Sequence, residues 1–166
     1  MNFLPIENIT FKTSLRQEEV VSRLRENTEP EKTLRFGFFN KKETKRYEGI
    51  ISEKYFSIKR IIEYGNSFLP IIKGTIQKDI QGTRVKVKMR LKTFVSVFIG
   101  IWCVGVGIGF ISILISSINK NEFESVIFLP LGMFVFVYLL TLGGFKAEST
   151  KSIKDLEKIL NGQRIK

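Results

Sequence analysis

The strongest pattern in the chain is a pair of long apolar runs in its C-terminal half. The first, Thr93 to Ile118, and the second, Val126 to Phe145, both lack charged residues. A helix that crosses a membrane needs about 20 apolar residues, and both runs reach that length. The linker Asn119 to Ser125 is too short for a folded domain. The pattern therefore predicts a helical hairpin that crosses a membrane and returns.

The first part of the chain consists of short segments with the helix and strand patterns of a small soluble domain. Ile6 to Thr13 indicates a strand, and Ser14 to Gln17 has the S-x-x-Q form of a capping box at a helix start. This helix should end near Asn27, because Pro30 disfavours helical geometry in the residue before it.

Alternating apolar and polar positions then predict a series of short strands. They are residues 34–38, Tyr47 to Ser52, Tyr55 to Tyr64, Leu69 to Gln77 and Thr83 to Leu91, of which the first two should form a hairpin. After the second apolar run, Glu148 to Leu160 is an amphipathic helix with one apolar side. Asn161-Gly162 is its stop signal.

These elements predict an α+β fold, an antiparallel sheet with one early helix and one C-terminal helix. The early helix favours a helix-grip-like topology, and a pleckstrin-homology-like barrel is the alternative. The expected division is a cytosolic domain at 1–92, a transmembrane hairpin at 93–145 with spans 93–118 and 126–145, and a C-terminal helix at 146–166 that packs on the sheet. The hairpin can be an insertion into one folding unit, because two antiparallel spans return the chain close to where it left.

Charge sets the expected orientation of this hairpin. The chain has 27 Lys and Arg against 16 Asp and Glu, a net charge of +11. The basic residues that flank the apolar runs are Lys86, Lys88, Arg90, Lys92, Lys146, Lys151 and Lys154, whereas the linker contributes only Lys120. By the positive-inside rule, we expect a multi-pass protein of the cytoplasmic (inner) membrane with both termini in the cytoplasm.

The clearest candidate for ligand binding is the strand that leads into the first apolar run. Between Thr83 and Lys92, apolar residues alternate with the cations Arg84, Lys86, Lys88, Arg90 and Lys92. This row should approach the cytoplasmic leaflet, where each basic residue near anionic lipid contributes on the order of 1 kcal/mol. The row could recognise a lipid headgroup or an acidic partner. It could instead only set orientation and protect an edge strand.

Three further polar residues are candidate ligand contacts. Arg60 shares the face of its predicted strand with Phe56 and Ile58, so it requires an acidic residue, backbone carbonyls or an anionic ligand, unless its head lies in water. Asn66 and Ser67 follow in a turn at the mouth of the sheet, a position where binding residues are common. The turn could equally be an ordinary one, with Asn66 in an unusual backbone conformation.

In the first apolar run, Gly105 and Gly109 have the G-x-x-x-G spacing that lets another helix approach closely. The second run is the expected partner within the chain, and association with a membrane protein or with a second copy is the other interpretation.

Missing residues exclude several classes of function. The chain has no histidine, and its one cysteine, Cys103, lies in the first apolar run. The commonest general base, the commonest metal ligand and an accessible thiol nucleophile are therefore absent. We expect no catalytic residues, no metal and no cofactor. We expect no nucleic acid as partner either, because no recognised binding module is present.

The stretches Tyr47 to Gly74 and Val87 to Leu91 are similar to a group of small bacterial membrane proteins that are themselves uncharacterised. That resemblance implies a cytosolic α+β domain, a two-helix transmembrane hairpin and a bacterial origin. It implies no activity for any residue.

Two functions fit these observations. In the first, the non-catalytic cytosolic domain binds a membrane lipid, a small apolar ligand or a partner protein at the membrane surface. In the second, the protein is an accessory subunit that packs its hairpin into a larger membrane complex. A pocket of several hundred Å3 favours the first. A filled core and an exposed stripe of small residues along the spans favour the second.

Overall fold

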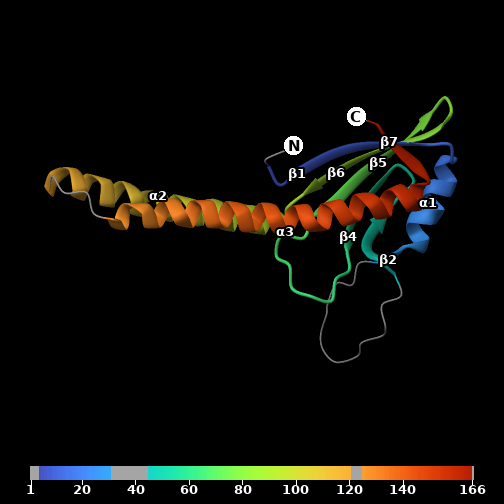
Figure 1. Ribbon diagram of the computed structural model, residues 1–166. Coiled ribbons are helices and arrows are strands. Elements are labelled where there is room, and N and C mark those ends of the chain that lie inside the picture. The colour runs from blue at the N-terminus through green and yellow to red at the C-terminus, as the bar shows by residue number, and fades with distance from the viewer. Residues whose placement is uncertain (1–3, 31–44, 121–124, 166) are drawn as a thin grey trace.

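The computed structural model describes residues 4–30, 45–120 and 125–165 and shows an α+β fold. A seven-stranded sheet carries a short helix, α1 (Gln17–Glu26), and two long helices, α2 (Thr93–Lys120) and α3 (Phe128–Leu160). Figure 1 shows α2 and α3 side by side, projecting from the sheet as an antiparallel hairpin, with the rest of α3 lying across one face of the sheet. The short helix η1 (Ser125–Ile127) precedes α3.

The sheet is mixed and open. Its strands are β1 (Ile6–Thr13), β2 (Thr28–Pro30), β3 (Tyr47–Ile51), β4 (Tyr55–Arg60), β5 (Ile71–Asp79), β6 (Gly82–Arg90) and β7 (Gly162–Ile165). The order is β2-β3-β4-β5-β6-β1-β7, with β2 and β3 parallel and all other neighbours antiparallel. The expectation of a purely antiparallel sheet is therefore wrong. Among the described residues the sheet does not close into a barrel, and the helix-grip likeness stays a prediction.

The sheet differs from the sequence expectation in two ways: it has an additional strand at each edge, and two inner strands have other bounds. β2 and β7 were not predicted: β2 because its proline indicated only the end of a helix, and β7 because Gly162 indicated only a stop. β4 ends at Arg60 instead of Tyr64, and β5 begins at Ile71 instead of Leu69. The strand expected at 34–38 lies outside the described residues.

One face of the sheet is buried and the other is open. Buried side chains alternate along β1, β4, β5 and β6 and meet apolar residues of α1 and the second half of α3. They include Phe11, Phe56, Ile58, Ile72, Ile76, Val85, Val87, Met89, Val20, Leu24, Phe145, Leu156 and Leu160. Within the described chain no helix covers the opposite face, and its side chains are mostly polar. This is the usual pattern of an antiparallel sheet with one solvated face.

Helix α1 begins three residues later than the expected capping box at Ser14. Thr13 is still paired with Thr83 in the sheet, and its Oγ1 accepts a hydrogen bond from the backbone N–H of Leu15 (3.2 Å). The turn therefore occupies the residues that were expected to begin the helix. The carboxylate of Glu19 instead accepts the backbone N–H of Arg16 (2.8 Å), which satisfies the helix start.

The second apolar run and the amphipathic segment after it form one continuous helix, α3, and not two. Gly143 and Gly144 lie in its middle without interrupting it. A Cβ on Gly144 would lie 2.9 Å from the ring of Phe68, so glycine allows the loop after β4 to lie directly on the helix. The helix ends at Asn161, which adopts the left-handed conformation (φ 43°), and the chain turns back to pair with β1.

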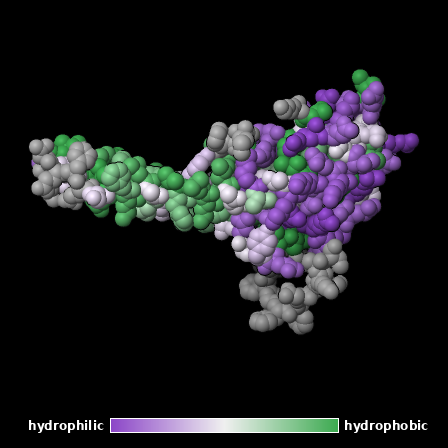
Figure 2. Space-filling view, viewed as in Figure 1, coloured by the Kyte–Doolittle hydropathy of each residue, from purple (hydrophilic) through white to green (hydrophobic). Residues whose placement is uncertain are grey.

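The hairpin of α2 and α3 exposes apolar side chains on nearly all sides. Figure 2 shows hydrophobic residues gathered along the projecting helices, whereas the surface of the sheet domain is mainly hydrophilic. By length and composition, both helices are long and apolar enough to span a membrane. Exposed residues include Phe98 (61%), Ile101 (70%) and Phe136 (64%), which water solvates poorly.

Candidate functional site

The open face of the sheet carries a groove of about 700 Å3, here called the open-face groove. Strand register shows that the groove is lined by two neighbouring rows of side chains, each of which runs across several strands. The first row is Tyr55, Thr75, Lys86, Thr10 and Ile165, and the second is Ser57, Lys73, Lys88 and Asn8. Short side chains therefore lie on both sides of Lys86, and the apolar side chains of Tyr55 and Ile165 lie at the two ends of the first row.

The groove is strongly cationic. Lys73 of β5 and Lys88 of β6 are directly opposite in the antiparallel register, and Lys86 is two residues from Lys88 on the same face. No carboxylate is among the described lining residues, and none of the three lysines has an ion pair with a described residue. Like charges directly opposite one another in a sheet are destabilising. The arrangement is thus unfavourable until an anion enters.

Acidic residues near the groove are already paired. At the turn between β5 and β6, Asp79 forms an ion pair with Arg84 (3.0 Å). A hydrogen bond from the backbone N–H of Ile80, and the neighbouring Arg84, lower the pKa of Asp79 below its ordinary value. Glu48 forms an ion pair with Lys59 (3.2 Å). The field of the lysines is therefore not neutralised from either side.

The structure places the predicted basic row on a central strand. β6 lies between β5 and β1, so the idea that the row protects an edge strand is wrong. Arg84, Lys86, Lys88 and Arg90 do alternate with buried residues, whereas Lys92 follows the half-buried Leu91 beyond the end of β6. Only Arg90 and Lys92 are adjacent to the start of α2 at Thr93. Lys86 is seven residues earlier, or about 20 Å along an extended strand. The middle of the row is therefore remote from the hairpin.

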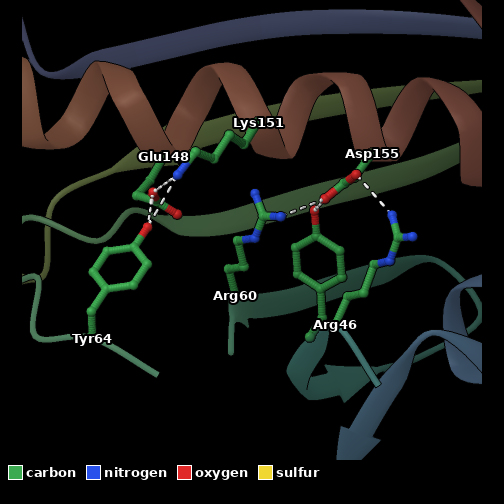
Figure 3. Close-up of polar contacts among 7 residues, drawn as sticks. Arg46, Arg60, Tyr64, Glu148, Lys151 and Asp155 are labelled. Carbon is green, nitrogen blue, oxygen red and sulfur yellow. Dashed lines mark hydrogen bonds and ion pairs between the residues drawn. The ribbon is translucent and has the colours of Figure 1, made fainter. Parts of the chain in front are cut away.

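Arg60 belongs to a different site, between β4 and α3. Its guanidinium forms an ion pair with Asp155 (3.2 Å), which also pairs with Arg46 (2.9 Å), as Figure 3 shows. The buried hydroxyl of Tyr47 donates to the same carboxylate (3.5 Å). Burial and the charge of Asp155 raise the pKa of Tyr47, so this tyrosine stays protonated and remains a donor. An acidic residue, backbone carbonyls and an anionic ligand were the partners expected for Arg60, and the structure shows the acidic residue Asp155.

Glu148, about two turns further back along α3, is the centre of a second polar cluster. Its carboxylate is 1% exposed and accepts hydrogen bonds from the hydroxyl of Tyr64 and from Lys151 (2.9 Å), as Figure 3 shows. Burial alone would raise the pKa of Glu148. The hydrogen bonds from Lys151 and Tyr64, together with the charges of Lys151 and Arg60, lower it below its ordinary value. These two clusters fasten α3 to β4 and the loop after it.

Asn66 also holds a loop in place. Its side-chain amide donates to the backbone carbonyl of Gly144 (3.2 Å), and its carbonyl oxygen accepts the N–H of Phe68 (2.9 Å). Both polar ends of Asn66 are therefore occupied by the backbone. Ser67 is exposed and lines a separate apolar groove at the base of the hairpin. The structure does not bring Asn66 or Ser67 together with the lysines.

Gly105 and Gly109 do not contact the second apolar helix. Apart from the chain neighbours and the nearby backbone of α2 itself, no heavy atom of a described residue lies within 4 Å of a Cβ built on either glycine. The expectation that α3 is their partner is wrong, because the two helices approach through other residues, such as Trp102 and Phe134 (ring centroids 6.4 Å apart). Their stripe is open to other molecules.

Sequence reasoning missed most of the groove. It found Lys86 and Lys88 from the alternation in β6, but not Lys73, Tyr55, Thr10 or Ile165, which reach the groove only through strand register. It also missed Asp155 and Glu148 as partners for Arg60 and Tyr64. Among the described residues no group of three or more Cys, Asp or Glu side chains could hold a metal ion.

No family model, curated protein or solved structure matches the chain. The likeness to small bacterial membrane proteins therefore stays a prediction.

Proposed function

We propose that this chain is an integral membrane protein whose cytosolic domain binds a phosphate-bearing anion on its open sheet face. The hairpin is the anchor, because its exposed apolar side chains need lipid around them. Since α2 and α3 are antiparallel, the sheet domain and both flanks of the hairpin lie on one side. The excess of basic residues at those flanks favours the cytoplasm.

The single observation that carries the proposed ligand is the unneutralised pair Lys73 and Lys88, with Lys86 beside it. Three lysines line a groove in which Thr10, Ser57 and Thr75 add hydroxyl donors. Phosphate oxygens accept hydrogen bonds from both kinds of donor, and an anion removes the repulsion between the lysines. Tyr55 and Ile165 offer apolar contact to the organic part of such a ligand.

Binding, and not catalysis, is the chemistry that this groove supports. Its described lining includes no carboxylate or thiol that could take up a proton or attack a substrate. Its lysines supply charge, and its hydroxyls supply orientation. The ligand can be a soluble phosphate ester or the headgroup of a lipid, because both present the same phosphate.

The test is phosphate binding by the full chain in mild detergent, measured by calorimetry with glycerol phosphate. We expect Lys73→Gln and Lys88→Gln each to weaken binding about tenfold. Lys78→Gln is the matched control, since Lys78 is on the same strand but at a position facing the other side of the sheet. Binding should also weaken as salt increases.

A second arm distinguishes the two sources of phosphate. The detergent-solubilised chain is mixed with vesicles of phosphatidylglycerol or phosphatidylcholine. Calorimetric binding of glycerol phosphate together with equal binding to both kinds of vesicle assigns the groove to soluble esters. A preference for the phosphatidylglycerol vesicles that Lys73→Gln reduces and Lys78→Gln keeps assigns it to headgroups. Equal losses in Lys78→Gln and Lys73→Gln, or no binding of either probe, would refute the proposal.

The accessory-subunit function is the alternative, and the open stripe at Gly105 and Gly109 favours it. Native mass spectrometry of the chain extracted in mild detergent should then show a heteromeric complex that Gly105→Leu dissociates. The control is Gly132→Leu. Gly132 lies on the other helix, and a Cβ at this position would also have no neighbour within 4 Å among the described residues.

A further inference from the structure

A second groove, of about 540 Å3, lies at the base of the hairpin, where α2, α3 and the loop after β4 meet. It is here called the hairpin-base groove. Its walls are apolar except for two hydroxyl groups. Its described lining includes Ser67, Phe68, Phe94, Trp102, Val137 and Thr141. We propose that this groove binds one acyl chain of a membrane phospholipid.

The groove exists because a loop is fixed over the start of the hairpin. Asn66 bonds to the backbone of Gly144, and the absence of a side chain on Gly144 lets Phe68 lie against α3. Phe68 and Ser67 thereby form one end of the groove. On the other side, the edge-on contact between Trp102 and Phe134 sets the spacing of the two helices. The hollow is built by specific contacts.

The position of the groove indicates its occupant. It is continuous with the apolar surface of α2 and α3, where Phe94 is 80% and Phe98 61% exposed. This inference rests on the membrane anchor proposed above: in a bilayer, lipid chains surround this surface and water does not. A groove open to that surface is therefore filled by hydrocarbon.

The environment of Thr141 favours a specifically bound lipid in one orientation over freely exchanging bilayer lipid. Thr141 is 7% exposed, it lines the groove, and its hydroxyl has no hydrogen-bond partner among the described residues. A helical threonine commonly bonds the carbonyl four residues earlier, and Thr141 does not. A buried hydroxyl without a partner is costly, so an acceptor is expected in the groove. The ester carbonyl of a phospholipid is such an acceptor.

Lys92 fits the phosphate of the same molecule, which is attached to the glycerol beside the ester. It precedes Phe94 by two residues, is exposed and has no ion pair with a described residue. A chain in the groove therefore ends near a cation that can bind the lipid phosphate. The proposed occupant is an anionic glycerophospholipid.

Trp102 makes the proposal measurable, since it is the one tryptophan of the chain and lines the groove. The full chain in mild detergent is titrated with phosphatidylglycerol that carries bromine on its acyl chains. We expect quenching of Trp102 to saturate at about one lipid per chain, and native mass spectrometry to show one retained phosphatidylglycerol. Quenching that rises without saturation would overturn the proposal.

Matched variants separate this groove from the general lipid surface. Val137→Phe fills the groove, whereas Val135→Phe adds the same bulk on the opposite side of α3, where Val135 is 58% exposed. We expect only Val137→Phe to lose the retained lipid. Thr141→Val keeps the shape and should weaken retention roughly three- to tenfold. Equal retention in all variants, or a dimer in place of the lipid adduct, would contradict it.

Failure of the anchor is detected independently. Carbonate extraction of cell membranes reports whether the chain is integral, and Val137→Phe should remain in the membrane fraction like the unchanged protein. Release of the unchanged protein would refute the anchor, whereas a retained anchor without bound lipid would refute only the groove.

Discussion

Asp155 should be the most sensitive polar residue of the domain, because two arginines and a buried tyrosine depend on it. Its carboxylate is 13% exposed, the side chain of Arg60 is 22% exposed, and that of Arg46 is 60% exposed. The variant Asp155→Ala removes the carboxylate that lies within ion-pair distance of Arg60 and leaves, among the described residues, only the more distant charge of Glu148. Arg46→Ala removes only the exposed partner.

The structure ranks the costs of these changes. Removing one partner of a fully buried ion pair costs about 3–5 kcal/mol, and the remaining exposure of Arg60 reduces this to about 2–3 kcal/mol for Asp155→Ala. Arg46→Ala should cost less than about 1 kcal/mol, because Arg46 is mostly in water. Replacing both partners, as Arg60→Met with Asp155→Leu, leaves no uncompensated charge and should recover most of the loss.

Urea unfolding of the detergent-solubilised chain, followed by far-ultraviolet circular dichroism, measures these free energies. The expected order of stability is unchanged protein, Arg46→Ala, then Asp155→Ala, with the double variant close to the first. If Asp155→Ala unfolds at the same urea concentration as Arg46→Ala, the argument that Asp155 compensates a buried Arg60 fails.

Three other changes test separate parts of the structure. Hydrogen bonds and charges hold the pKa of Glu148 below its ordinary 4.5. The contribution of Glu148 to stability is therefore complete above that pH and is lost as the pH falls through the folded pKa. Urea unfolding at decreasing pH should show this loss of stability, and Glu148→Gln should remove the pH dependence that Glu148 causes. Gly74→Ala should cost about 1–3 kcal/mol in the same assay, because the new Cβ would lie 2.1 Å from the buried ring of Phe56. Asn161→Val should cost about 1–2 kcal/mol, because a β-branched residue resists the left-handed conformation at the end of α3.

Each of these has an internal control. Gly65→Ala should change stability by less than about 0.5 kcal/mol, since no heavy atom of a described residue lies within 4 Å of its Cβ. Asn161→Gly should be tolerated, since glycine adopts the left-handed conformation freely. An unchanged acid transition in Glu148→Gln would show that other carboxylates control the loss of stability.

Much of the architecture could be predicted from periodicity. The alternation from Thr83 to Leu91 identified β6, with Val85, Val87 and Met89 buried as expected. The apolar side of Glu148 to Leu160 identified the helix that covers the sheet. What failed was local: the start of α1 depends on Thr13 remaining in the sheet, and the strand β2 depends on a parallel partner, β3. Neither partner is near in the sequence.

The candidate site could be predicted only in part, for the same reason. Lys86 and Lys88 belong to one strand and are visible in its pattern. Lys73 becomes their neighbour only because β5 pairs with β6 in one particular register, which places it directly opposite Lys88. A shift of one residue would put Lys73 on the buried face. The charge of the groove is thus a property of register.

By itself, the sequence determined the two apolar helices, their orientation signals and the alternation of each strand, because these follow from periodicity and composition within one segment. The tertiary structure alone decided that α3 continues from the apolar hairpin into the sheet domain, that Arg60 forms an ion pair with Asp155, and that three lysines from two strands line one open groove. Those features are contacts between distant segments. Their geometry is set by strand pairing and by packing on α3, and no local pattern encodes it.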